Sequence, residues 1–139
     1  MTFIIDASVA LKWYVEEEDS ETARKLLQDT SRLEAPDLII PEVTNFVWKK
    51  WRQHEFTQVQ AESTVSSIMR LFETIHSSKT LSGHALNLSL TLDHPAYDCF
   101  YLACAEIRGA ILVTADMKFH DKVKSSQFGD IVSSLDDLL

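Results

Sequence analysis

FIIDASVALKW, residues 3–13, is the stretch from which the fold can be worked out. Its first three residues are aromatic or β-branched, and this apolar run stops at Asp6, which is typical of a buried strand that reaches the edge of a parallel sheet. A second run, AILVT at residues 110–114, ends two residues before Asp116. Apolar residues at helical spacing fill most of the chain between the two runs. This alternation predicts a three-layer α/β domain, in which helices cover both faces of a parallel sheet of about four or five strands.

The first half of the chain contains three predicted helices. Ser8 is expected to cap the first and Ser20 to open the second, so that the two form an early helical hairpin. Pro36 and Pro41 bracket a turn, and Pro41 suits the first turn of a third helix that has Glu42 near its start.

The second half continues the helical pattern. The clearest amphipathic helix spans residues 57–75, with a stripe made of Ala61, Val65, Ile68, Phe72 and Ile75. A further helix precedes the His94-Pro95 break, with Leu81, Ala85, Leu88 and Leu92 on one face. The next one ends at Gly109 and carries Phe100, Ala103, Cys104 and Ile107. The tail, residues 130–139, allows one short strand and a final turn.

Composition limits the class of protein. The 139 residues fit one domain, 1–139, and 45% hydrophobic residues with only three Gly and three Pro exclude a low-complexity chain. A net charge of −8 disfavours a wholly basic surface for nucleic acid. No apolar run is long enough to span a membrane and the start lacks a basic leader, so a cytoplasmic protein is expected. Cys99 and Cys104 are expected to be reduced core residues, since two cysteines are too few for a disulfide framework.

Four acidic residues lie where predicted elements begin or end. Asp6 and Asp116 follow the two apolar strands, Asp98 begins the helix that leads into the second strand, and Glu42 begins a third helix. Carboxylates that converge repel one another unless a cation neutralises them, and their hard oxygen atoms favour Mg²⁺ or Mn²⁺. Such a cluster suits phosphodiester hydrolysis. Each aspartate taken alone could instead be an ordinary helix cap.

Four sequence words resemble those of PIN-domain ribonucleases, particularly the VapC toxins of bacterial toxin–antitoxin pairs: FIIDASVALKW, PEVTNFVW, YDCFYLACAEIRGA and LVTADMKF. The resemblance spans roughly residues 2 to 132. It matches Asp6 to the first acid of the family, Asp98 to the third in a Y-D helix start, and Asp116 to the fourth in T-x-D. The second acid lies in an E-x-x-N helix start, which matches Glu42 and Asn45. Two hydroxyl positions beside the metal match Ser8 and Thr114.

The resemblance implies a metal-dependent endoribonuclease. Asp6, Asp98 and Asp116 would bind one Mg²⁺, for which Mn²⁺ can substitute, while Glu42 would orient the attacking water or complete the coordination shell. The products would carry a 3′-hydroxyl and a 5′-phosphate. The implied partners are the RNA substrate, a cognate VapB-like antitoxin and a second copy of the chain. We expect the homodimer to use part of the helix at residues 43–51, and the antitoxin to lie against the early hairpin around Val9, Trp13 and Leu27.

Two other functions remain open at this point. An aspartyl-phosphate phosphotransfer domain also has an aspartate at a strand end, although Asp6 is followed by Ala7 and Ser8 rather than by a second acid. A PIN-fold binding module without turnover would use the acids as caps and partner contacts.

Two further features allow two interpretations each. Residues 48–54, WKKWRQH, could contact RNA or form a solvated helix face with Trp51 on its apolar side. Lys118, Lys122 and Lys124 could meet a phosphate backbone or likewise lie on a solvated face. The five histidines are expected to be surface or packing residues.

Overall fold

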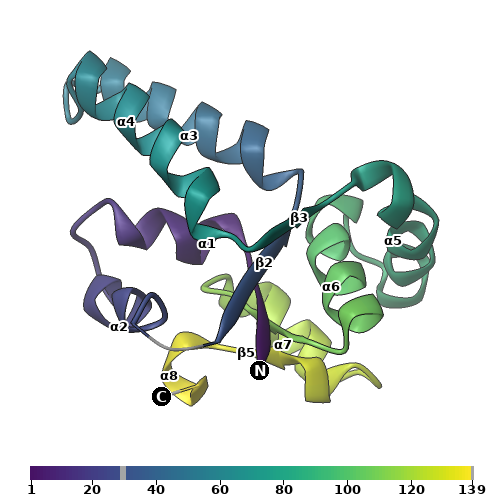
Figure 1. Cartoon of the computed structure of the whole chain (residues 1–139). Coiled ribbons are helices and arrows are strands. Elements are labelled where there is room, and N and C mark those ends of the chain that lie inside the picture. The colour runs from purple at the N-terminus through teal and green to yellow at the C-terminus, as the bar shows by residue number, and fades with distance from the viewer. Residues whose placement is uncertain (29–30, 139) are drawn as a thin grey trace.

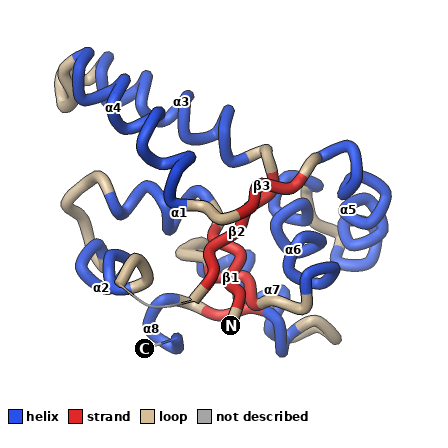
Figure 2. Tube along the Cα trace, in the orientation of Figure 1, coloured by secondary structure: helices blue, strands red, loops and turns tan. Residues whose placement is uncertain are grey.

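The centre of the molecule is a five-stranded parallel sheet with the strand order β3-β2-β1-β4-β5. The computed structural model describes residues 1–28 and 31–138. The strands are β1 (Thr2–Ile5), β2 (Arg32–Pro36), β3 (Thr74–His76), β4 (Ile111–Val113) and β5 (Val132–Ser133). Figures 1 and 2 show helices on both sides of this sheet. The predicted three-layer α/β architecture is therefore confirmed.

The two strands recognised from their apolar runs are neighbours at the middle of the sheet. Ile4 and Ile5 of β1 are fully buried, and Ile5 is in register with Val113 of β4. Burial on both faces explains why these strands are continuously apolar rather than alternating. Because the strands are parallel, the residues that follow β1 and β4 emerge side by side at one edge of the sheet.

Helices and turns connect every pair of strands. They are α1 (Ala7–Ala10), η1 (Leu11–Trp13), α2 (Ser20–Lys25), α3 (Ile39–Arg52), α4 (Gln58–Ile68), η2 (Met69–Leu71), α5 (Ser78–Leu92), α6 (Ala96–Arg108), α7 (Met117–Lys124), η3 (Gly129–Ile131) and α8 (Leu135–Leu138). In Figure 1, α5 and α6 lie on one side of the sheet and α1 and α2 on the other, while α3 and α4 form a hairpin that extends away from it.

The sequence analysis did not predict β2 or β3. The amphipathic helix expected at residues 57–75 ends at Ile68, and Ile75 instead lies in β3, where it pairs with Ala35 of β2. A strand of three residues gives no readable period, and its single apolar residue continued the helical stripe by chance. Strand β2 was hidden by the buried charge of Glu34 at its centre.

Two other local predictions need correction. The side chain that caps α1 is that of Asp6, which accepts a hydrogen bond from the Val9 amide, and not that of Ser8. Helix α6 does end at Gly109, whose φ of 62° favours glycine. However, Ile107 is 54% exposed, because the buried face of α6 is centred on Leu102 and its neighbours.

Both cysteines are free and buried, as expected. Within residues 1–28 and 31–138, no helix combines the length and apolarity needed to traverse a membrane.

Candidate metal site

The first predicted acid, Asp6, occupies the junction between β1 and α1 and is only 9% exposed. Its pKa is raised to about 6 from 3.8, mainly by burial, although hydrogen bonds from Ser8, Thr114 and the Val9 amide act in the opposite direction. The charge of Asp98 adds to the increase. Neutral groups thus donate hydrogen bonds to Asp6, while the neighbouring carboxylate of Asp98 opposes its ionisation.

The two predicted hydroxyls join Asp6 to the end of β4. The Ser8 hydroxyl donates to Asp6 Oδ1 and accepts a hydrogen bond of 3.0 Å from the Ala115 amide. Thr114 is fully buried, and its hydroxyl accepts a hydrogen bond of 3.0 Å from the Asp116 amide. Ser8 and Thr114 therefore bridge the strand ends that carry the first and fourth acids.

Asp116 begins α7. Its Oδ1 atom accepts a hydrogen bond of 3.2 Å from the Phe119 amide, so the side chain is a helix cap, and the residue is exposed. The capping interpretation is therefore correct for Asp6 and Asp116. It does not exclude a metal site, because a capping carboxylate keeps a second oxygen.

Glu42 lies in the first turn of α3, as predicted, and points to the same region. Its Oε1 atom accepts a hydrogen bond of 2.6 Å from the hydroxyl of Tyr101 on α6. Burial raises the pKa of Glu42, the Tyr101 hydrogen bond lowers it, and the charge of Asp98 raises it again. Asn45, the fourth residue of the E-x-x-N word, is exposed one turn further along α3.

Asp98 is in the first turn of α6 and links the other acids electrostatically, because its charge acts on both Asp6 and Glu42. Its Oδ2 atom accepts a hydrogen bond of 2.7 Å from His94 Nε2. The structure thus brings Asp6, Glu42 and Asp98 within electrostatic range of one another, and connects Asp116 to Asp6 through Thr114.

The chemistry of this donor set fits a hard divalent cation. Asp6 is buried beside a like charge and has only neutral hydrogen-bond donors, so an added cation would favour its ionised form. No group of three acidic, His or Cys side chains stands ready to hold a metal ion among residues 1–28 and 31–138. Asp98 is engaged through Oδ2 by His94 and Asp116 through Oδ1 by the Phe119 amide, so each carboxylate keeps its other oxygen for an ion.

Sequence reasoning missed two residues that hold these acids. Tyr101 is 3% exposed. Burial, and after it the negative charge of Glu42, raises the pKa of the Tyr101 hydroxyl well above the usual range. His94 packs on Phe119, in line with the expected packing role, and also contacts Asp98 directly. A signal was present, since His94 lies four residues before Asp98, just ahead of α6, and Tyr101 lies three residues after Asp98 on that helix.

The basic residues expected near RNA differ in their surroundings. The Nζ atoms of Lys122 and Lys124 donate to backbone carbonyls of Asp93 and of Gly129, respectively, whereas Lys118 is exposed. On α3, the guanidinium of Arg52 lies 5.4 Å from the ring centre of Trp48.

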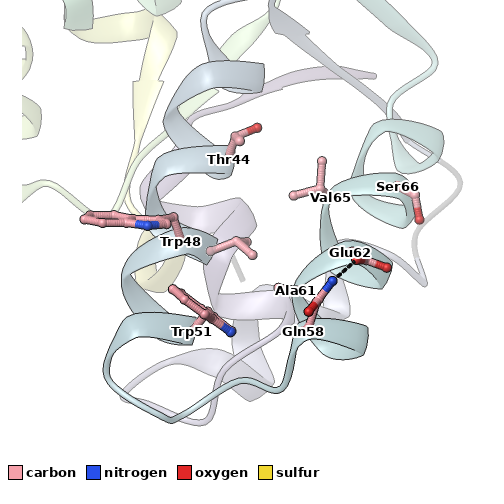
Figure 3. A pocket seen from close by; sticks show the side chains of 9 residues that line it. Thr44, Trp48, Trp51, Gln58, Ala61, Glu62, Val65 and Ser66 are labelled. Carbon is pink, nitrogen blue, oxygen red and sulfur yellow. Dashed lines mark hydrogen bonds between the residues drawn. The ribbon is translucent and has the colours of Figure 1, made fainter.

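An apolar groove of about 510 Å³ lies between α3 and α4. Figure 3 shows Trp48 and Trp51 on one wall and Ala61 and Val65 on the other. Trp51 lies with Val47 on the apolar side of α3, as expected, but both indoles are about half exposed, so this side is open. The groove is separate from the acids except that α3 carries Glu42 at its other end.

The surface expected to receive an antitoxin is largely buried. Val9 is fully buried and Trp13 is 7% exposed, with its Nε1 atom donating to the carbonyl oxygen of Ala23 at 2.9 Å. Leu27 alone is open, at 38%. Val9 and Trp13 are part of the core, so the expectation that they anchor a partner was wrong.

Comparisons with known proteins are consistent with this geometry. The family model described as the PIN domain matches residues 3–124. The chain is 31% identical over 124 residues to Ribonuclease VapC3 of Pyrobaculum aerophilum, an alignment that covers 88% of this chain and 95% of that protein.

Three solved structures share the fold. PAE2754 from Pyrobaculum aerophilum aligns with a TM-score of 0.70 and 20% identity, over 99% of this chain and 86% of that one. VapBC2 from Rickettsia felis, bound to a DNA fragment from its promoter, aligns with a TM-score of 0.69 and 16% identity, over 96% and 98%. VapBC-1 from nontypeable Haemophilus influenzae aligns with a TM-score of 0.69 and 13% identity, over 98% and 99%.

Proposed function

Because this chain belongs to the PIN-domain family, we propose that it is a VapC-type endoribonuclease that hydrolyses RNA phosphodiester bonds with a divalent metal ion. The observation that carries this proposal is the convergence of Asp6, Glu42 and Asp98 at the sheet edge, in a chain 31% identical to a ribonuclease over most of its length. The buried, electrostatically opposed carboxylate of Asp6 supports the metal requirement.

Asp6, Asp98 and Asp116 would hold the ion, directly or through water. A bound Mg²⁺ would neutralise a non-bridging phosphate oxygen and the leaving oxygen, and would lower the pKa of the attacking water. The network of Ser8 and Thr114 fixes the Asp6 carboxylate against the end of β4, which keeps the first and fourth acids close together.

Glu42 orients the attacking water, because its carboxylate is held by Tyr101 at one oxygen and keeps the other to accept a hydrogen bond. The water oxygen forms the new bond to phosphorus while the bond to the 3′ oxygen breaks. The attacking water releases one proton to solvent and the leaving 3′ oxygen takes up one proton from solvent, so the step balances. The products carry a 5′-phosphate and a 3′-hydroxyl.

A direct test is cleavage of a labelled single-stranded RNA by the purified chain with Mg²⁺, with Mn²⁺ and with EDTA. We expect cleavage with either metal and none with EDTA, and we expect Asp116→Asn to abolish cleavage while the protein stays folded. Folded protein without cleavage under any condition would favour the binding module. A phosphorylated Asp6 would favour the phosphotransfer domain.

The partner proposed for the α3–α4 groove is an antitoxin segment with apolar anchors. Two half-exposed indoles on an apolar wall are typical of a docking surface. Two of the solved structures that share this fold are VapBC structures. An Arg of the same partner would reach the acids, because a guanidinium can engage two carboxylates at once. Trp51→Ala should weaken the complex at least tenfold and leave RNA cleavage unchanged.

We also propose that the working form is a homodimer. The prediction that part of the helix at residues 43–51 contributes to the dimer contact stays a prediction, and Leu86 and Leu90, exposed on successive turns of α5, give the chain a second apolar face for it. Light scattering should give about twice the mass of the 15.8 kDa chain at micromolar concentration. If Trp51→Ala converts a dimer to a monomer, the groove belongs to the second copy and not to the antitoxin.

A further inference from the structure

His94 occupies the short connection between α5 and α6, immediately before the Pro95 that precedes α6. Its side chain is 11% exposed and donates from Nε2 to Asp98 Oδ2 at 2.7 Å. An ionised carboxylate can only accept, so the ring must carry its proton on Nε2. This bond fixes one oxygen of Asp98 and leaves Oδ1 for another ligand.

The ring also contacts the helix that Asp116 begins. Its centre lies 4.6 Å from the ring centre of Phe119, which is buried in α7. The amide of the same Phe119 is the group capped by Asp116 Oδ1. One side chain therefore touches both the third acid and the residue on which the fourth acid is anchored.

The backbone of His94 is fixed from two directions. Its amide donates to the carbonyl oxygen of Ser89 at 3.2 Å, and the Ser89 hydroxyl donates back to the His94 carbonyl oxygen. From α7, Lys122 Nζ donates to the carbonyl oxygen of the preceding Asp93 at 2.7 Å. A ring on such a restrained backbone has little freedom, so it can hold its hydrogen-bond partner in one orientation.

We propose that His94 is a positioning residue of the metal site: it holds Asp98 Oδ2 and packs on Phe119, and so sets the orientation of Asp98 relative to Asp116. This inference rests on the proposed function, because it assigns His94 a role toward the ion that the acids would bind. Partners that orient metal-binding carboxylates typically change metal affinity or activity by about 10–100-fold when removed.

A purely structural role would give a different result. Pro95 provides no side-chain cap for α6, so the contact between His94 and Asp98 could serve only to stabilise the start of that helix. Removing it would then lower the melting temperature and leave metal affinity per folded molecule unchanged. The orientation of Asp98 is tested by metal affinity and by kcat, measured on protein that is folded.

The chain contains a matched control. His84 on α5 forms the same kind of bond to a carboxylate, that of Glu106 on α6, and neither residue is among the predicted site residues. His84→Ala removes a histidine–carboxylate pair between α5 and α6, whereas the His94 pair links the connection between these helices to the first turn of α6. An effect on Mn²⁺ affinity in His94→Ala but not in His84→Ala would therefore come from the orientation of Asp98 and not from the loss of a histidine–carboxylate pair as such.

The experiment is Mn²⁺ titration by calorimetry on the full chain, with a thermal melt and RNA cleavage kinetics for each variant. His94→Ala should weaken Mn²⁺ binding about tenfold and lower kcat similarly, with KM for RNA unchanged. His94→Phe keeps a ring against Phe119 but has no donor, so it should behave as His94→Ala. His94→Gln restores a donor near Nε2 and should recover affinity to within about threefold of the wild type. His84→Ala should bind Mn²⁺ as the wild type does.

If Asp98→Asn weakens Mn²⁺ binding but folded His94→Ala and His94→Phe bind it as the wild type does, the positioning role is overturned while the metal site stands. If the wild type does not bind Mn²⁺, the metal site itself is wrong and the role of His94 falls with it.

Discussion

Two buried acids, one within β2 and one at the end of the neighbouring β1, have pKa values shifted in opposite directions. Glu34, inside β2, is 1% exposed, and burial alone would raise its pKa. Hydrogen bonds from Arg108 and His76 outweigh burial and hold the pKa below the usual value. Asp6, at the end of β1, receives hydrogen bonds from the neutral groups of Ser8, Thr114 and Val9, and its pKa is raised to about 6. Among the residues that the structure describes, Glu34 thus has a cationic partner, whereas the hydrogen-bond donors of Asp6 are neutral.

We interpret this difference as that between a structural acid, Glu34, and the acid proposed to bind the ion, Asp6. The two Arg108 hydrogen bonds to Glu34, at 2.9 Å and 3.2 Å, are part of the fold and are present whenever the chain is folded. At Asp6 the charge of Asp98 opposes ionisation, and the proposed divalent ion, or a cationic side chain of a partner, would compensate it.

The largest expected effect is on activity. Asp6→Asn should reduce RNA cleavage by about 100-fold or more, because it removes a carboxylate from the proposed metal site. Glu34→Gln, the equivalent change at the structural acid, should leave kcat within about threefold of the wild type when measured on folded protein. Equal losses of activity in the two variants would remove the functional distinction between these acids.

Stability should respond to pH through Asp6. Between pH 4 and 6 the folded chain keeps a proton on Asp6 that the unfolded chain releases, so the free energy of unfolding should fall as pH rises through this range. A pKa of about 6 in the folded chain against 3.8 in the unfolded one corresponds to at most about 3 kcal/mol. Urea unfolding of the wild type and of Asp6→Asn in EDTA at pH 4 to 8 isolates this contribution. The free energy of unfolding of the variant should increase relative to that of the wild type as pH rises. Parallel curves would mean that Asp6 ionises as freely as in the unfolded chain.

The matched change at Glu34 should have the opposite sign. Glu34→Gln should lower the free energy of unfolding at pH 7 by about 1–2 kcal/mol, because the charge that pairs with Arg108 and His76 is lost. This loss should shrink as pH falls through the titration range of Glu34, where the wild type also becomes neutral. Urea unfolding at pH 7 and pH 3.5 measures both values, and a stabilised Glu34→Gln variant would contradict the structural role.

Much of the fold and of the site could be predicted from the sequence. The runs at residues 3–5 and 110–114 identified the two central strands, because burial on both faces makes such strands apolar throughout. The four acids followed from their places at element ends and from the PIN-domain resemblance. Each of Asp6, Glu42, Asp98 and Asp116 does lie at the start of a helix at that edge of the sheet or beside it.

The rest depended on three-dimensional contacts that have no local signature. Strand β2 contains a buried glutamate that pairs with two distant residues, His76 and Arg108, the latter 74 positions later. Trp13 could not be assigned to the core before the carbonyl of Ala23 and the ring of Phe72 were known to contact it. The contact of Tyr101 with Glu42 joins residues 59 positions apart.

The smallest expected effect concerns the groups that hold the acids. Tyr101→Phe removes the hydroxyl that donates to Glu42, so the pKa of Glu42 should rise further while the free energy of unfolding changes by less than about 1 kcal/mol. The acid limb of the pH profile of cleavage should therefore shift to higher pH, with a loss of about threefold to tenfold on that limb and little change above it. A pH profile identical to that of the wild type would show that Tyr101 does not tune this acid.

The central claim is that Asp6 lacks a cation that a divalent ion provides, whereas Glu34 already has one. The most direct measurement is the melting temperature at pH 7.5 as Mn²⁺ is added to metal-free wild type, Asp6→Asn and Glu34→Gln. Ligands that bind only the folded state raise its stability. We expect Mn²⁺ to raise the melting temperature of the wild type and of Glu34→Gln but not that of Asp6→Asn. In EDTA, before metal is added, Asp6→Asn should have the highest melting temperature of the three. An equal rise in all three proteins, or none in the wild type, would contradict it.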